Sequence, residues 1–285
     1  MKLTRIEPNE LGESDTERFA THTSEFEARV YELLDRLLAA PDSDVATGLV
    51  ENFVFNPNDA IPKRGRRPGL RSPYLNEQIY RSYSETAAHR DDLLAVSILI
   101  NEYFDVLDDI IDGDVTEGYE LQVFLTVEFL QPLTVRYLHR LGDEAVSYWF
   151  DNTTLLLECF LDEHRMEPTA ENYATLLEKQ SRLFGLLSGM SALVANADSE
   201  HVANAEQLGK ALFKMYQFHL DVAQYPDDSS VPWNVCHLLD TDEIGAEMAR
   251  TKRRAMEHLE RVPDGRIELI RPMITLDVDS WVASI

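Results

Sequence analysis

The chain has 285 residues, 44% of them apolar, so it can bury a sizeable core and is not a disordered segment. Its 51 acidic and 26 basic residues give a formal net charge of −25, which repels nucleic acid and anionic membranes. An acidic surface of this kind keeps a protein soluble in strong brine, so we interpret the charge as halophilic adaptation that says little about chemistry.

The two cysteines, Cys159 and Cys236, lie far apart and without metal-ligand spacing. A disulfide framework is therefore not expected, and a reducing cytoplasm is the default location. Residues 1–11 carry no apolar signal segment, and no apolar run reaches the roughly 18 residues that span a bilayer. We therefore expect a soluble, cytoplasmic protein without a membrane span.

The hydrophobic pattern along the chain is almost entirely helical. Residues 1–16 form a polar arm, and from Thr16 to Ala40 apolar residues recur at helical spacing until Pro41. Residues 56–73, rich in Pro, Gly and Arg, read as a loop. Further helices are predicted over about 74–88, 89–113, 119–141, 143–164, 169–196, 201–225, 241–262 and 264–282. No alternating run is long enough for a sheet, which predicts one all-α domain over residues 17–285, a single-domain antiparallel helix bundle.

The predicted helix 89–113 carries a polar stripe within a nearly all-apolar body. Asn101, Asp105, Asp108 and Asp112 follow at intervals of four, three and four residues, so they share one helical face, with Asp109 beside it. Carboxylates one turn apart repel each other, and a proton, a basic partner or a divalent cation must offset that repulsion. Carboxylate oxygens suit Mg²⁺, which also bridges to substrate phosphates. A solvated face of an acidic protein is the open alternative.

Cations gather in three other segments. Residues 63–71 form the densest positive cluster, and arginine forks there suit bidentate contacts to phosphate. A loop that pairs with surface acids is the alternative interpretation. Lys179 lies within the predicted helix 169–196, where a lone lysine is often a surface residue with a buried stem. The helix 201–225 carries a polar stripe at helical spacing that consists of Lys210, Lys214, Gln217, Asp221 and Gln224.

The segment Asp108-Asp109-Ile110-Ile111-Asp112 resembles DDxxD, the first aspartate-rich motif of the polyprenyl synthetase (trans-isoprenyl diphosphate synthase) family. An Arg-Arg-Pro cluster about forty residues upstream, a lysine-bearing helix about seventy downstream and a later Tyr-Gln helix keep the family's order over about residues 20–282. The resemblance implies the class I isoprenoid synthase bundle. It also implies a Mg²⁺-dependent prenyltransferase that condenses isopentenyl diphosphate with an allylic diphosphate.

The resemblance assigns roles to the aspartate helix. Asp108, Asp109 and Asp112 match the catalytic motif, and Asp108 and Asp112 match its metal ligands. Tyr103 and Phe104 lie five and four residues before the first aspartate, where bulky side chains shorten the product in the family. A short-chain product is therefore implied.

The remaining roles fall on other segments. Arg64 and Arg67 match the cations that grip isopentenyl diphosphate, and Lys179 matches the lysine that contacts the allylic diphosphate. Gln217 follows Tyr216, as a Gln follows Phe before the family's second DDxxD motif. In that register Asp221 is the one carboxylate retained, and it is expected to bind metal or substrate.

Several positions depart from the family pattern. The second motif has Leu220 and Gln224 in place of two aspartates, and Thr116-Glu117 stands where the family has Arg-Arg. Asn101 replaces a histidine seven residues before the first motif and is expected near the substrate. These departures leave two alternatives open: a non-catalytic partner of an active synthase, and a divergent class I terpene synthase or lyase that uses one allylic diphosphate. The family also implies a homodimer or pairing with a related subunit.

Overall fold

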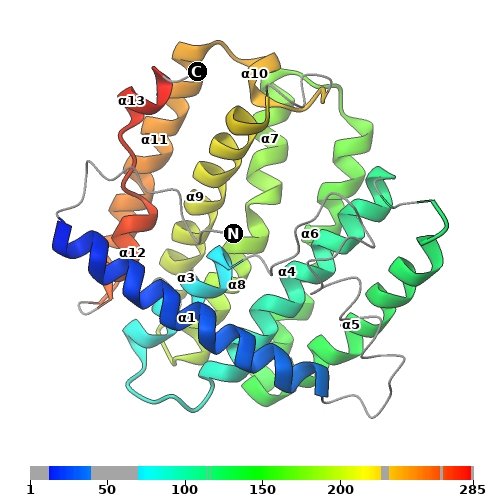
Figure 1. The fold of residues 1–285 in the computed structure, drawn as a ribbon, viewed down its shortest axis with the longest axis vertical. Helices are drawn as coiled ribbons and strands as arrows, with labels where there is room; N and C mark the ends of the chain where they lie inside the picture. The colour runs from blue at the N-terminus through cyan, green and yellow to red at the C-terminus, as the bar shows by residue number, and fades with distance from the viewer. Residues whose placement is uncertain are drawn as a thin grey trace.

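The computed structural model describes residues 13–39, 70–113, 115, 117–225, 231–263 and 266–283, and every element in these ranges is helical (Figure 1). The elements are α1 (Glu13–Ala39), α3 (Arg71–Tyr83), α4 (Arg90–Asp112), α5 (Glu120–Leu141), α6 (Asp143–Arg165), α7 (Ala170–Gln180), α8 (Arg182–Val194), α9 (Ser199–Gln224), α10 (Val235–Leu238), α11 (Thr241–Leu259), α12 (Ile267–Ile270), the 3₁₀ turn η3 (Arg271–Met273) and α13 (Val278–Val282). The predicted all-α fold is confirmed. No helix in this described part is long and apolar enough to cross a membrane.

Some helix boundaries follow from short-range chemistry. The Asp240 side chain accepts from the backbone N–H of Glu243, whose own side chain returns the contact, and this capping box starts α11. The aspartate helix α4 ends at Gly113, which adopts a left-handed φ of 73° that a glycine tolerates without strain. The predicted N-terminal arm lies outside the described residues up to residue 12, and residues 13–16 already belong to α1.

Two predicted helices are broken in the structure. The helix expected over 169–196 is interrupted at Ser181, which separates α7 from α8. The fully buried Ser181 hydroxyl donates to the carbonyl of Glu178, 2.8 Å away, and a serine that bonds back to its own helix competes with the backbone ladder and bends it. The segment 264–282 forms short pieces, α12, η3 and α13, instead of one helix.

The helices pack around a central pair, α8 and α9, with α11 on one side and α4 and α5 on the other, while α1 crosses the bundle (Figure 1). One apolar cluster joins α1, α3, α4, α5, α6 and α8. A second joins α7, α9, α11 and the C-terminal turns. Both clusters take side chains from α3 and α8, so these two helices connect the halves of the core.

Glycines let α8 and α9 approach closely. A Cβ atom on Gly209 of α9 would lie 2.4 Å from the backbone oxygen of Phe184 on α8. A Cβ atom on Gly189 of α8 would lie 2.6 Å from Cγ of Glu206 on α9. Any side chain at Gly209 would force the two backbones apart. Residues 184–189 of α8 therefore pack closely against α9.

Helix α3 is buried on nearly all sides although it carries several polar residues. Asn76 is the central one: its Nδ2 donates to Oγ of Ser97 on α4 (3.1 Å), and its Oδ1 accepts from Oγ of Ser188 on α8 (3.1 Å). Its Nδ2 also lies 3.2 Å from Oγ of Ser72 one turn earlier. One amide thus joins three helices, and it satisfies buried hydroxyls that would otherwise lack partners.

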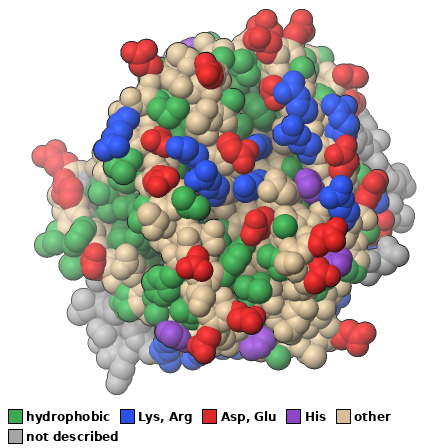
Figure 2. Space-filling view, turned by 180° about the vertical axis from the view of Figure 1, so that it is seen from behind, with side chains coloured by type: hydrophobic (Ala, Val, Ile, Leu, Met, Phe, Trp, Pro, Cys, Tyr) green, Lys and Arg blue, Asp and Glu red, His purple; other side chains and the backbone are tan. Residues whose placement is uncertain are grey.

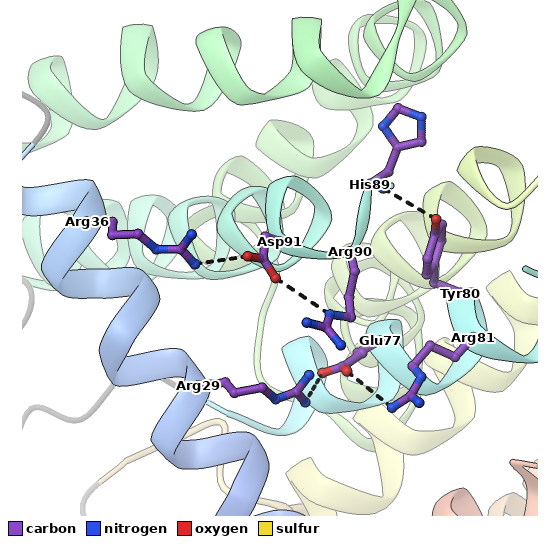
Figure 3. A network of polar contacts seen from close by, with 8 residues as sticks. All are labelled: Arg29, Arg36, Glu77, Tyr80, Arg81, His89, Arg90 and Asp91. Carbon is purple, nitrogen blue, oxygen red and sulfur yellow. Dashed lines mark hydrogen bonds and ion pairs between the residues drawn. The ribbon is translucent and has the colours of Figure 1, made fainter. Parts of the chain in front are cut away.

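A second polar network ties α1 to the bundle (Figure 3). The buried carboxylate of Glu77 on α3 forms ion pairs with Arg29 on α1 (2.8 Å) and Arg81 on its own helix (3.7 Å). Arg36, further along α1, pairs with Asp91 on α4 at 2.9 Å. The Glu77 pair contributes more than the exposed Arg36–Asp91 pair, because solvent screens exposed ion pairs.

Replacement of Asn76 by Ala is expected to destabilise the fold by about 2–4 kcal/mol, because it opens a small cavity and leaves a buried Ser188 hydroxyl without an acceptor. Urea unfolding followed by circular dichroism measures the change. A double-mutant cycle with Ser188→Ala separates the hydrogen bond from the cavity, and a coupling energy near zero would show that the bond does not contribute.

Candidate functional site

The aspartate face of α4 begins where the buried body of the helix ends. Residues 93–100 are all buried, whereas Asp108 and Asp109 are partly exposed and Asp105 is exposed. Asp112 is the last residue of α4, and its side chain lies outside the described part. The carboxylates of the motif therefore lie at the solvent end of a helix whose other turns are fixed in the core.

The environment of Cys159 on α6 shows what faces Asp108. Burial, with smaller contributions from the negative charges on Glu163, Asp108 and Asp162, raises the pKa of the Cys159 thiol to about 12, while Lys179 acts in the opposite direction. These four charged groups therefore lie around one thiol, although they come from three helices, α4, α6 and α7. The thiol is buried, whereas Asp108, Asp162 and Lys179 are each partly exposed, so solvent partly screens these charges from one another.

Lys179 is the one positive charge among the groups that shift the Cys159 pKa. Its ammonium donates to the carboxylate of Asp162 on α6, and both side chains are about one quarter exposed. The next residue, Gln180, lies 3.4 Å from the carboxylate of Glu163. Helix α7 therefore presents Lys179 and Gln180 to α6.

Asp162 and Glu163 were not predicted from the sequence as site residues. Their signal was weak: two adjacent acids near the end of an amphipathic helix look like ordinary surface residues. They are 54 and 55 positions from Asp108, as their numbers show, so only the packing of α4 against α6 brings them near it.

The predicted chain-length residues lie one turn deeper in the same region. The ring of Phe104 is buried and stacks on Phe160 of α6, with centroids 6.0 Å apart and an interplanar angle of 6°. It also meets Trp149 edge-on. Tyr103 is partly exposed, packs edge-on against Phe104, and its hydroxyl accepts from Gln131 of α5 at 3.0 Å. Aromatic rings therefore fill the space between α4 and α6 below the aspartates.

Asp221 on α9 is buried, and both of its carboxylate oxygens accept hydrogen bonds. Oδ1 accepts from Gln217, which is one turn earlier, at 2.7 Å. Oδ2 accepts from the Tyr173 hydroxyl of α7 at 2.9 Å and from the backbone N–H of Val235, the first residue of α10, at 3.0 Å. Burial raises the pKa of Asp221, while these donors lower it. Gln217 and Asp221, predicted as ligands of substrate or metal, here join α7, α9 and α10 to one another.

The other predicted site residues are placed as follows. Asn101 is buried on α4, and its amide donates to the carbonyl of Ser97. Arg64 and Arg67 lie outside the described residues. The predicted basic cluster is represented by Arg71 at the start of α3, whose guanidinium lies 3.9 Å from the ring centroid of Tyr216 on α9. Both residues line a small pocket of about 60 Å³ that is otherwise mainly apolar.

Among the described residues, no group of three or more His, Cys, Asp or Glu side chains is arranged to hold a metal ion. The Asp112 side chain lies outside these described residues. The described part of the site thus offers a pair of adjacent carboxylates on α4, two more acids on α6 and one cation on α7, all in a partly buried setting. Such an arrangement can bind a phosphate only where positive charge offsets the acids.

Comparison with solved structures shows the fold that this site is built on. The chain resembles a geranyltranstransferase from Methanosarcina mazei, with 14% identity, 90% of this chain and 97% of that chain covered, and a TM-score of 0.71. It resembles a geranylgeranyl pyrophosphate synthase from Corynebacterium glutamicum, with 15% identity, 99% and 96% covered, and a TM-score of 0.69. A mint geranyl pyrophosphate synthase, described as heterotetrameric, gives 12% identity, 90% and 99% covered, and a TM-score of 0.68.

The likeness covers nearly the whole of each protein, so the chain has the fold of the isoprenyl diphosphate synthases. The predicted class I isoprenoid synthase bundle is confirmed. No protein-family model matches the chain. No curated protein sequence matches it either.

Alkylation of the cysteines tests the juxtaposition of α4 and α6. At pH 8, iodoacetamide is expected to modify partly buried Cys236 faster than Cys159, because the thiolate is the reactive form and the pKa of Cys159 is about 12. Asp108→Asn removes one of the charges that raise this pKa, so Cys159 should react about two- to fivefold faster, measured by mass spectrometry. Asp151→Asn, an exposed acid on α6, is the matched control. Equal Cys159 rates in wild type and Asp108→Asn would contradict the placement.

Proposed function

We propose that the chain is a divergent member of the polyprenyl synthetase family and a Mg²⁺-dependent prenyltransferase. It joins isopentenyl diphosphate to an allylic diphosphate. The proposal is carried by the first aspartate motif on α4 and Lys179 on α7, which both act on the pKa of Cys159, together with the fold of the isoprenyl diphosphate synthases. Several carboxylates but only one cation, Lys179, are found around Cys159. The metal ions of a metal-bound diphosphate would balance the excess negative charge, and its phosphate groups would bind the lysine.

The donor set on α4 fits Mg²⁺ in one particular mode. Mg²⁺ usually keeps several waters and binds through one or two carboxylates together with substrate phosphates, so it needs no protein cage of three ligands. Asp108 and Asp112, one turn apart on α4, would hold it, with Asp109 beside them. The metal would act as a Lewis acid that lowers the energy of the departing diphosphate.

The residues of the chain supply the rest. Lys179 donates to the allylic diphosphate once substrate displaces its present partner, Asp162. Arg64 and Arg67 orient isopentenyl diphosphate, and the apolar bundle excludes water from the carbocation that forms when the diphosphate leaves. The double bond of isopentenyl diphosphate attacks that carbocation, and loss of a proton completes the new prenyl chain.

A short product follows from the aromatic packing below the aspartates. Phe104 is stacked on Phe160 and contacts Trp149, so a growing chain meets rings between α4 and α6 within one turn of Asp108. A short-chain product is therefore expected. Asn101 and Gln217 remain predicted substrate contacts.

One observation favours a second candidate function, a class I enzyme that ionises a single allylic diphosphate. Both carboxylate oxygens of Asp221 are engaged by protein donors, which favours a structural role for that residue over metal binding. The metal role of Asp221 stays a prediction. If Asp221 binds no metal ion, α9 brings less positive charge to the substrate site. Two diphosphates would then be harder to bind together than one.

Turnover distinguishes the two functions. Purified protein in high salt, with Mg²⁺, an allylic diphosphate and labelled isopentenyl diphosphate, should form an elongated, labelled prenyl diphosphate. Asp108→Asn is expected to lower kcat/KM by about a hundredfold or more, because the carboxylate stabilises charge at the reacting centre through the bound metal. Asp151→Asn, an exposed acid on α6, should stay within about twofold of wild type.

Three outcomes would count against the prenyltransferase. Release of inorganic diphosphate without elongation supports the second candidate. No turnover alone, with elongation restored by a co-purifying synthase, supports a non-catalytic partner subunit. Full activity in Asp108→Asn would remove the aspartate motif from the mechanism.

We further propose that the chain forms a homodimer through α5 and α6. Leu121 and Phe124 on α5, and Phe150 and Leu161 on α6, are each more than half exposed, and α5 and α6 pack against each other. In a chain of net charge −25, four large exposed apolar side chains on one pair of helices indicate a surface that another protein molecule covers. A second copy presents the same apolar surface, as a two-fold interface requires.

Phe124→Arg is expected to convert the dimer into a monomer in light scattering coupled to gel filtration, because it places a charge in an apolar interface. Val231→Arg is the control, since Val231 is an exposed apolar residue that lies on neither α5 nor α6. A wild-type protein that is monomeric at micromolar concentration would refute the homodimer.

A further inference from the structure

A second pocket lies between α7, α9 and α11, with a volume of about 310 Å³. Helix α7 lies between this pocket and α6, and the proposed substrate site around Asp108 and Lys179 (the aspartate cleft) lies on the α6 side of α7. On α7, Lys179 contacts α6, whereas the preceding residue, Glu178, contacts Lys210 and Lys214 of α9. The side chains of two consecutive residues thus serve two different sites.

The pocket is lined by two pairs of cations. Lys210 and Lys214 lie one turn apart on α9, and Arg250 and Arg254 lie one turn apart on α11. Seen from behind, positive side chains gather in the upper half of the molecule, the half to which α7 and α11 extend (Figures 1 and 2). Two cation pairs on facing helices are unexpected in a chain with about twice as many acids as bases.

The acids in the lining do not neutralise these cations. Glu178 and Glu247 are the two carboxylates, so four positive charges face two negative ones and the balance is +2, with His258 counted as neutral. Burial lowers the pKa of His258, and Arg261 lowers it further, which justifies that count at neutral pH. The local sign is therefore opposite to the −25 of the whole chain.

The partners of each cation show where an anion would bind. Glu178 is shared by Lys210, at 3.4 Å, and Lys214. Glu247 pairs with Arg250 at 2.8 Å. Within the described part of the chain, no carboxylate lies at ion-pair distance from Arg254, whose charge is felt by His258. The pocket therefore has more donors than acceptors.

Apolar side chains make up much of the remaining lining. Leu177 of α7, Phe218 of α9 and Leu239 before α11 are among them. Lys210 and Lys214 are largely shielded from solvent, with side chains 22% and 18% exposed, so they act more strongly on a bound anion than the exposed arginines of α11 do. A volume of about 310 Å³ is within the range of small-molecule pockets.

We propose that this pocket binds a small, multiply charged phosphate anion, of the diphosphate class, at a site separate from the aspartate cleft. One phosphate group contacts the α9 lysines and the other contacts the α11 arginines. Glu178 competes with the anion for Lys210 and Lys214, so it sets the affinity of the pocket. The site needs no divalent metal, because protein cations supply the charge.

Calorimetric titration with inorganic diphosphate in the presence of EDTA tests the proposal. Chelation removes metal-dependent binding in the aspartate cleft, and a Lys179→Ala background removes the cleft's lysine as well. Moderate salt limits non-specific attraction without erasing specific contacts. Circular dichroism confirms that each variant is folded.

Arg254→Ala is expected to weaken diphosphate binding by about tenfold, the usual loss for one charge-assisted contact. Arg253→Ala is the matched control, because Arg253 is the adjacent exposed arginine of α11 and is not part of the lining. It should change the affinity by about twofold or less. Glu178→Gln should tighten binding, since it removes the competing carboxylate.

Three results would overturn the proposal. Wild type that binds no diphosphate would show that the pocket is not an anion site. Equal losses in Arg254→Ala and Arg253→Ala would show that only the general charge of α11 matters. Binding that disappears in Lys179→Ala would assign the anion to the aspartate cleft.

Discussion

The side-chain amide of Asn76 joins three helices in the middle of the bundle, and the geometry of the candidate site depends on that contact. Through Ser97 it fixes α4, which carries the aspartates, and through Ser188 it fixes α8, which continues from the helix that carries Lys179. Polar groups in a dry core tolerate few alternative arrangements, because each lost bond leaves an unsatisfied partner. The amide thus fixes α4 and α8 relative to α3.

Close packing and bending complete this frame. Gly209 allows α9 to approach the backbone of α8, and Ser181 bends the chain between α7 and α8. Because of that bend, α7 lies between α6 and the pair formed by α9 and α11. Its two neighbouring charged residues then pair with different helices: Lys179 contacts α6, and Glu178 contacts α9. Helix α7 therefore lies between the acidic region around Asp108, where we propose that metal ions bind, and the basic pocket, where we propose that an anion binds.

Local patterns predicted much of the fold. The aspartate helix was expected over 89–113 and spans Arg90–Asp112, because its apolar body is continuous and Gly113 ends it. The break at Ser181 was missed, since a serine in a helical pattern gives no sign of whether its hydroxyl will bond back to the backbone. The last segment was expected as one helix and forms short turns, which tertiary packing decides.

The site was less predictable than the fold. A motif locates Asp108 and Lys179 along the chain, but the acids that surround them, Asp162 and Glu163, are set by how α6 packs. Asp221 is the opposite case. Its position in the second motif predicted a metal ligand, but its buried carboxylate accepts hydrogen bonds from three protein donors. Which neighbours a carboxylate finds is a long-range property that spacing along one helix cannot supply.

The most direct test of the metal-bridged site is a crystal structure of the protein with Mn²⁺ and a non-reactive allylic thiodiphosphate, collected at the manganese absorption edge. We expect anomalous density at about 2.0–2.3 Å from the carboxylate oxygens of Asp108 and Asp112, with the diphosphate in contact with Lys179. A diphosphate bound elsewhere, with no manganese at Asp108, would contradict the assignment of α4 as the metal-binding helix.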